Sequence, residues 1–292
     1  MNNHSKIQNS PGILTIRFED VSAGWDQWIL TSSDRHHDNV LCDRELEIKH
    51  LQKALERDAL ILDFGDLFCA MQGKWDKRSR MDNIRKEDVG VNYLDLIVDH
   101  AADDYKDYAK NWALLARGNH ECAILNHHGT DLTSNLCHRL NVLGGNVYTG
   151  GIGGWVRFQF VINKTKHKTI NLKYHHGASK NPDAQVTRGV IQTNRQAVYE
   201  PDAQIVVNGH SHDAYTVPIA RERMSDMGVQ YRDLCWFIRT PGYKNEFGDG
   251  SVGWANEQQK PPKPLGCIWL HFSYPKGRDD TIIDVECIEE LV

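Results

Sequence analysis

Five short apolar runs in this chain of 292 residues each end abruptly in Asp, Asn or His. Short apolar runs bounded by turn residues are typical of buried strands. The residues that follow them are poor strand formers, and Gly often stands among them. The polar stretches are "DRH" (34–36), "GD" (65–66), "GNHE" (118–121), "HHG" (175–177) and "GHSH" (209–212). Ligands gather outside the carboxyl ends of strands in open α/β sheets, so these side chains should meet at one edge.

Helical spacing separates the runs in the first half of the chain. Apolar residues recur at helical intervals over 41–58 and 91–111, and strands are expected at 13–20, 26–33, 59–64 and 112–117. A further helix is expected over 122–141. Alternation of strand and helix indicates an α/β layered fold with its strands in the interior.

The second half is rich in strands. A hairpin is expected from 155–162 and 168–175, with further strands at 202–209, 234–241, 266–274 and 281–288. No linker or internal repeat divides the chain, so one domain over 1–292 is predicted, with 1–12 as a flexible leader.

Composition narrows the functional classes. The net charge of −5 and the pI near 6.3 argue against a broad surface for polyanions. The seven cysteines are odd in number and lack C-x-x-C spacing, which favours free thiols in a reducing compartment. No signal peptide or membrane span is visible, so a cytoplasmic protein with no membrane partner is expected.

The polar residues at the strand ends form a metal-ligand set. Asp34 and His36 could belong to an ordinary turn, Asp66 could cap a helix, and His210 and His212 could lie in a surface loop. Together they indicate two metals that share a carboxylate, because one zinc takes only four ligands. The seven expected side chains are Asp34, His36, Asp66, Asn119, one of His175 and His176, His210 and His212.

The order of these motifs resembles the calcineurin-like metallophosphoesterase superfamily. D-x-H, G-D, G-N-H-E, H-x-G and G-H-x-H follow one another over 34–212. The resemblance implies a four-layer αββα sandwich of two mixed sheets. It also implies that Asp34, His36 and His212 hold metal one and that Asp66 bridges. Metal two would then be held by Asn119, His210 and His175, which fits the fourth motif better than its rival His176.

Two further residues acquire catalytic roles from the resemblance. His120 matches the superfamily's non-ligand histidine, which contacts substrate or protonates the leaving group, and Arg117 matches a phosphate-binding arginine of the phosphoprotein-phosphatase branch. That branch continues its second motif as G-D-x-x-D-R-G, whereas this chain has "GDLFCAMQG". Other stretches, such as "YHHGASKNPDAQVTRG", are similar to metallophosphoesterases of phages and prophages.

The implied reaction is hydrolysis of a phosphoester by a hydroxide that two divalent metal ions activate. Mn²⁺ is the first expectation, with Fe or Zn²⁺ as alternatives. The substrate could be a nucleic acid or nucleotide cleaved at a diester, or a protein or small-molecule monoester; a metal-binding scaffold without turnover is the third alternative. A basic loop at 73–88, with Trp75 inside it, could receive a polyanion or could be only a charged surface.

Overall fold

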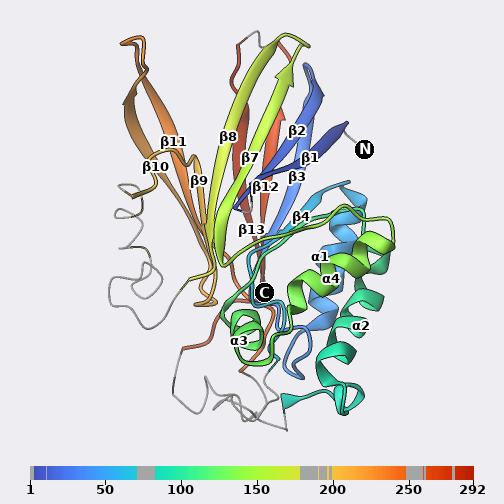
Figure 1. The fold of residues 1–292 in the computed structure, drawn as a ribbon. Coiled ribbons are helices and arrows are strands. Elements are labelled where there is room, and N and C mark those ends of the chain that lie inside the picture. Colours follow the sequence, from blue (N-terminus) through green and yellow to red (C-terminus); the bar gives the residue numbers. More distant parts are fainter. Residues whose placement is uncertain are drawn as a thin grey trace.

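The computed structural model places two β-sheets beside a group of helices (Figure 1). It describes residues 3–10, 12–70, 83–177, 190, 196, 199–247, 259, 261–277 and 280–292. Most of the basic loop expected at 73–88, including Trp75, lies outside these residues.

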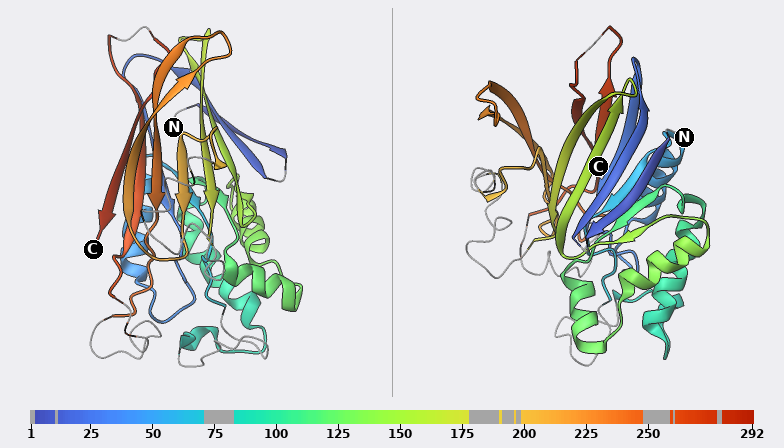
Figure 2. Two further views of the ribbon diagram at one scale, coloured as in Figure 1. Left: turned by 90° about the vertical axis from the view of Figure 1, so that its left-hand side faces the viewer. Right: turned by 45° about the horizontal axis from the view of Figure 1, so that its top comes forward.

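The larger sheet has seven strands in the order β1-β2-β7-β8-β9-β11-β10. In Figures 1 and 2 the β10–β11 hairpin at its edge extends away from the helices. Its strands are β1 (His4–Ser10), β2 (Ile13–Val21), β7 (Gly153–Ile162), β8 (Lys166–His175), β9 (Ile205–Asn208), β10 (Tyr215–Met224) and β11 (Gln230–Arg239).

The smaller sheet has six strands in the order β13-β12-β3-β4-β5-β6. Strands β3 to β6 are parallel to one another, and β12 and β13 add an antiparallel edge. Its strands are β3 (Trp25–Ser32), β4 (Leu60–Asp63), β5 (Trp112–Leu115), β6 (Tyr148–Thr149), β12 (Gly266–Tyr274) and β13 (Asp284–Leu291).

A shared apolar core holds the two sheets together. The rings of Phe158 and Phe160 on β7 contact Phe272 on β12, with centroids 4.9 and 5.5 Å apart. The inner faces of β2, β3, β4, β5 and β8 complete this core with aliphatic side chains. Burial of so much apolar surface is the main force that fixes the sheets against each other.

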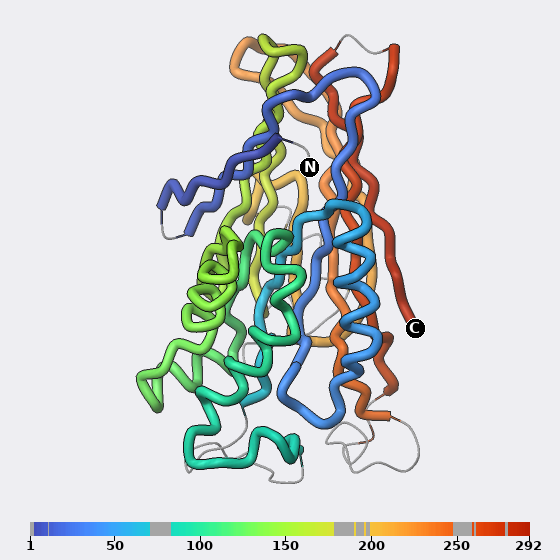
Figure 3. The backbone as a smooth tube through the Cα atoms, turned by 90° about the vertical axis from the view of Figure 1, so that its right-hand side faces the viewer, coloured from blue at the N-terminus to red at the C-terminus, as the bar shows by residue number. Residues whose placement is uncertain are grey.

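The helices of the described residues cover the outer face of the six-stranded sheet, as Figures 1 and 3 show. They are α1 (Arg44–Glu56), α2 (Tyr93–Tyr105), α3 (Asn119–His128) and α4 (Leu132–Val142), with short 3₁₀ turns η2 (Lys86–Asp88) and η3 (Lys106–Tyr108). A second apolar core separates them from the sheet. The predicted class, mixed α/β with two mixed sheets and flanking helices, is confirmed, and one outer helical layer is seen among the described residues.

Three local predictions differ from the structure. Residues 4–10 form strand β1, paired with β2, and are not a flexible leader. The helix expected over 122–141 is two helices, because Gly129 ends α3 at φ 69° and Asp131 then caps α4 by accepting from the N–H of Ser134. Strand β10 was not predicted; none of its residues is buried, and partly buried and exposed positions alternate along most of it.

No helix among the described residues is long and apolar enough to cross a membrane.

Candidate metal centre

The candidate ligands gather where the carboxyl ends of the two sheets meet. Strands β3, β4 and β5 are parallel in one sheet, and β8 and β9 are parallel in the other, so their chains leave the sheets at a common edge. Hydrogen bonds cross between the sheets at this point: the N–H of His210 donates to Asp34 Oδ2 at 2.8 Å. The convergence expected from the sequence therefore occurs.

One group of donors comes from the loops after β3 and β9. One ligand atom each from Asp34, His36 and His212 lies within 4.8 Å of the others. Asp34 is fully buried, and its Oδ1 lies 3.3 Å from Nε2 of His212. These are the three residues predicted for metal one.

A second group comes from the loops after β4, β8 and β9. Ligand atoms of Asp66, His176 and His210 lie within 4.8 Å of one another. One end of the Asn119 amide lies 2.7 Å from Nδ1 of His210 and 3.2 Å from both Nε2 of His176 and Oδ2 of Asp66. The two groups are adjacent, because Nε2 of His176 lies 3.0 Å from Oδ2 of Asp66 in its own group and 4.0 Å from Oδ1 of Asp34 in the other.

The structure corrects the choice between the paired histidines. His176 enters the cluster, and its ring is oriented by a 3.0 Å hydrogen bond from Nδ1 to the carbonyl oxygen of Phe64. His175 ends β8, and its Nδ1 accepts from the N–H of Gly177 at 3.0 Å. Neighbouring residues of an extended chain point to opposite sides, so only one of the pair can face the cluster. Motif spacing had favoured His175.

Backbone strain marks the same residues. Asp34, His36 and Asp66 have φ of 53°, 49° and 56°, and His210 and His212 have φ of 70° and 56°. A left-handed conformation in a residue other than Gly costs about 1–3 kcal/mol and persists only where its surroundings enforce it. Five such residues within one cluster indicate that strained backbone conformations, which lower the stability of the fold, orient these side chains towards the cluster.

Glycine in the second and third motifs has a steric reason. A Cβ on Gly65, where φ is 103°, would lie 2.5 Å from the backbone nitrogen of Gly118. A Cβ on Gly118 would overlap the Asp66 carboxylate. The two loops therefore touch backbone to backbone, which lets the N–H of His120 donate to Asp66 Oδ1 at 2.9 Å.

Glu121 joins these two loops. Its carboxylate accepts from the N–H groups of Gly118 at 2.8 Å, Phe68 at 2.8 Å and Asp66 at 3.1 Å. Burial, followed by the charge of nearby Asp66, raises the pKa of Glu121 to about 8. This buried carboxylate orients both loops, which explains the last letter of "GNHE".

The electrostatics of the cluster require positive charge. Burial opposes ionisation of the His176 ring, yet Asp66 and Asp34 raise its pKa to about 10. Burial likewise disfavours the Asp66 carboxylate, but His176 and His120 hold its pKa well below its usual range. Burial and the neighbouring His120 lower the pKa of His36. Among the described residues, imidazole protons offset the charge of the two buried carboxylates, a role that divalent cations fill more completely.

Two side chains have polar atoms whose surroundings are consistent with a bound metal ion. Nδ1 of His36 is buried and has no hydrogen-bond partner among the residues that the structure describes. The Asn119 amide oxygen faces His210 Nδ1 and Asp66 Oδ2, which are acceptors, and only a swapped amide would turn its NH2 group towards them. A cation among these atoms would satisfy all of them. The donor set of carboxylate, amide and imidazole fits a divalent transition metal.

His120 lies beside the cluster, as predicted for a residue that faces substrate. Its ring is 11% exposed, and its Nε2 lies 3.8 Å from Oδ2 of Asp66. Its Nδ1 contacts the carbonyl oxygen of Cys69 at 2.6 Å. Because a carbonyl only accepts, Nδ1 carries the proton, and Nε2 is the nitrogen that can exchange one.

Arg117 is placed elsewhere. Its guanidinium forms a bidentate pair with Asp131 at the start of α4, with Nε 3.2 Å from Oδ1, and a long contact of 3.5 Å to the carbonyl of Gly150. No described contact joins it to the ligand cluster. The local motif "RGNHE" indicated a phosphate contact, but it could not reveal that Asp131, fourteen residues later, would take this side chain.

Arg35, between two of the ligands, anchors their loop. Its guanidinium pairs with Asp63 at 2.9 Å and with Glu47 at 2.8 Å, and all three side chains are fully buried. Asp34 and His36 face the cluster while Arg35 points into the protein. This role of Arg35 was not predicted, and the only local signal for it is the alternation D-R-H over 34–36.

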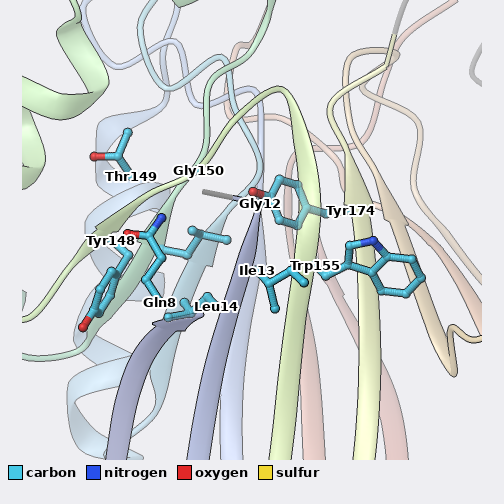
Figure 4. Close-up of a pocket in the computed structure, with 10 residues that line it drawn as sticks. Gln8, Gly12, Ile13, Leu14, Tyr148, Thr149, Gly150, Trp155 and Tyr174 are labelled. Atoms are coloured by element: carbon cyan, nitrogen blue, oxygen red, sulfur yellow. The ribbon is translucent and has the colours of Figure 1, made fainter. Parts of the chain in front are cut away.

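The structure also contains a small cavity that none of the cluster residues lines. It measures about 10 Å³ and lies between β1, β2, β7 and the β6 region, lined by Ile13, Trp155 and Tyr174 among others (Figure 4). It holds at most about one water molecule. None of the predicted ligands lines it.

Comparisons with known proteins give only distant similarity. No family model matches the sequence, and no curated protein matches it. Similar solved structures include a zinc complex of Vps29 from Entamoeba histolytica, with 9% identity over 90% of this chain and 98% of that chain and a TM-score of 0.38. The calcineurin-like phosphoesterase YfkN from Bacillus subtilis shares 12% identity over 90% of both chains with a TM-score of 0.35. A metallophosphoesterase from Sphaerobacter thermophilus shares 13% identity over 90% and 89%, with a TM-score of 0.32.

Proposed function

We propose that this protein is a metal-dependent phosphoesterase with a dinuclear centre. The observation that carries the proposal is the pair of adjacent donor groups, Asp34–His36–His212 and Asp66–His176–His210, with the Asn119 amide beside the second. In this proposal Asp66 bridges the two positions. Two adjacent metal positions are typical of enzymes that cleave phosphoesters by displacement at phosphorus. A structural metal is usually held in a closed site by four ligands of its own.

Bound metals would supply a Lewis acid and an activated water. The protein's own residues supply the rest. Buried Asp34 and Asp66 fix the spacing of the two positions, and the strained loops prevent them from relaxing. His120 holds its Nδ1 proton on the Cys69 carbonyl, so its Nε2 is the atom that can protonate a leaving oxygen.

The donor chemistry supports Mn²⁺ as the first metal to test. Asp66, Asn119 and two imidazoles form an oxygen- and nitrogen-rich set, which Mn²⁺, Fe²⁺ and Zn²⁺ all accept. For the substrate we propose a phosphodiester of nucleic acid or a nucleotide, with a phosphomonoester of protein or small molecule as the alternative.

The test uses purified full-length protein stripped of metal and reloaded with Mn²⁺. Metal content is measured by mass spectrometry, and hydrolysis is followed with bis-p-nitrophenyl phosphate, p-nitrophenyl phosphate, and single- and double-stranded DNA. We expect two metals per chain and turnover of at least one substrate. Preference for the diesters would support the nuclease or phosphodiesterase assignment, and preference for the monoester would support a phosphatase. Two bound metals without any turnover would contradict an enzyme and indicate a scaffold.

A further inference from the structure

The segment that follows β11 passes directly beside the proposed metal centre. The N–H of Tyr243 donates to the carbonyl oxygen of Asp34 at 3.1 Å. A Cβ on Gly242 would lie 2.8 Å from that same oxygen and 3.1 Å from Nδ1 of His212. The backbone at 242–243 is therefore packed against two of the residues that form the first metal position.

Lys244, the next residue of this segment, carries a positive charge that is largely shielded from solvent. Its ammonium group forms an ion pair with Glu246, and the two side chains are only 10% and 12% exposed. An antiparallel bridge to Cys42 fixes its backbone. Lysines are almost never buried to this extent unless they are paired, so the ion pair holds the charge in a defined place.

The charge of Lys244 acts on the side of the cluster where the first metal position and His120 meet. Burial is the main cause that lowers the pKa of His36, and the charges of His120 and Lys244 follow. Burial raises the pKa of the Cys69 thiol to about 12, and Lys244 is the largest cause that opposes this rise. Ligand atoms of His36, Cys69 and His120 lie within 4.8 Å of one another, so they form one side of the centre. Because the force between charges falls with distance, Lys244 lies close to that side.

A phosphoester at this centre would present charged oxygens that protein cations can bind. Lysine binds phosphate as a point charge, and arginine binds it as a fork. Arg117 was expected to supply such a charge, but it pairs with Asp131 instead. Lys244 lies beside a ligand of the first metal position and near His120, where a bound phosphoryl group would meet its leaving oxygen. It is therefore better placed than Arg117 to contact that group.

We propose that Lys244 binds a phosphoryl oxygen of the substrate and that Glu246 holds the lysine in place before the substrate arrives. The inference rests on the proposed function, because the phosphoryl group must first be bound at the metal positions. The ammonium group donates a hydrogen bond to an oxygen that is not part of the cleaved bond, and it neither gains nor loses a proton. Monoesters and diesters both have such oxygens, so the contact serves either substrate class.

Binding of inorganic phosphate tests this contact without turnover. Metal-free protein is loaded with Mn²⁺, its metal content is measured, and phosphate is titrated by isothermal calorimetry. We expect Lys244→Met to keep both metals and to bind phosphate about ten- to a hundredfold more weakly than the wild type, the usual worth of a hydrogen bond between charged groups. Lys244→Arg keeps the positive charge and should retain most of the affinity.

Lys53→Met is the matched control. Lys53 lies on α1 and also pairs with a glutamate, since its Nζ is 2.7 Å from Oε2 of Glu290. No described contact joins it to the ligand cluster. The variant should bind phosphate as the wild type does. An equal loss of affinity in Lys53→Met would show a general effect of net charge and would overturn the inference.

The outcomes separate this inference from the proposed function. Absence of bound metal in the wild type would contradict the dinuclear centre and the inference with it. Two bound metals without phosphate binding, or equal phosphate affinity in the wild type and Lys244→Met, would contradict only the contact. Loss of metal in Lys244→Met would show that the lysine acts through the ligands, which also overturns the contact.

Steady-state kinetics provide a second measurement. In Lys244→Met the KM for bis-p-nitrophenyl phosphate and for p-nitrophenyl phosphate should rise more than kcat falls, the pattern of an interaction already made with the bound substrate. A lower kcat at unchanged KM would contradict it. If Lys244→Met does not fold, Lys244→Gln takes its place with the same expectation, because Gln also removes the charge but stays polar.

Discussion

The backbone N–H of His210 donates a 2.8 Å hydrogen bond to Oδ2 of Asp34, across 176 residues of sequence. This bond joins the loop after β9 in one sheet to the loop after β3 in the other. It occupies one carboxylate oxygen and leaves Oδ1 facing Nε2 of His212 at 3.3 Å. Part of the centre is thus assembled by backbone groups, and the relative position of the two sheets sets the distance between its ligands.

Asp66→Asn should remove metal and activity together. The substitution keeps the shape of the side chain but removes the charge that serves both positions. We expect turnover to fall at least about 10³-fold, because charge stabilisation by metals is worth several kcal/mol. Metal content and hydrolysis of bis-p-nitrophenyl phosphate check this. Asp103→Asn, on the exposed face of α2, is the control and should behave as wild type. Full metal content and full rate in Asp66→Asn would show that the dinuclear interpretation is wrong.

The paired histidines provide the most direct comparison. His176→Ala should lose affinity for metal and most turnover, because its Nε2 lies 3.0 Å from Asp66 Oδ2 within the cluster. His175→Ala removes an imidazole from the neighbouring residue and should retain two metals. Isothermal titration with Mn²⁺ distinguishes the variants. If His175→Ala loses metal and His176→Ala keeps both metals, then His175 is the ligand, as the motif spacing favoured.

His120→Ala should keep both metals while turnover falls about 10²- to 10⁴-fold, the usual contribution of a general acid. Its backbone N–H, which holds Asp66, is unaffected by the change. The deficit should shrink with a substrate whose leaving group needs no proton, such as a p-nitrophenyl ester. Loss of metal in this variant would instead make His120 a ligand.

Arg117 has two possible roles that a pair of variants separates. If it only anchors α4 through Asp131, then Arg117→Met and Asp131→Asn should both lower the free energy of unfolding by about 1 kcal/mol or less, as partly exposed ion pairs do. Asn still caps a helix, so Asp131→Asn isolates the charge. The KM should stay unchanged in both. A raised KM in Arg117→Met alone would show that Arg117 leaves Asp131 to bind phosphate.

The sequence predicted the parts of the site that depend on local pattern. Asp34, Asp66 and Asn119 each follow an apolar strand, and parallel strands bring such ends to one edge. The choice of His176 over His175 depended on which face of β8 meets the cluster, a matter of sheet packing. The pairing of Arg117 with Asp131 depended on where α3 stops, at Gly129. Both contacts depend on how distant elements pack together, and the spacing of apolar residues along the sequence does not reveal that packing.

Strand β1 shows the same limit, because its polar sequence resembles a leader yet it is tied down by Lys6. Nζ of Lys6 donates to the carbonyl oxygens of Trp112 at 2.9 Å and Asn146 at 2.8 Å. The hydroxyl of Tyr148 donates back to the Lys6 carbonyl at 3.0 Å. These partners belong to the other sheet and its connections, more than 100 residues away, so no local pattern could indicate them.

Lys6 should also make stability depend on pH. Burial lowers its pKa from 10.5 to about 8. Between these values the unfolded chain holds a proton that the folded chain has released, so the free energy of unfolding should rise with pH in this window. The gain approaches about 3 kcal/mol, at 1.36 kcal/mol for each pKa unit. Urea unfolding at pH 7 and pH 10 measures it. The difference between wild type and Lys6→Met removes the titration of other groups, and an identical pH dependence in both proteins would contradict the lowered pKa of this partly buried lysine.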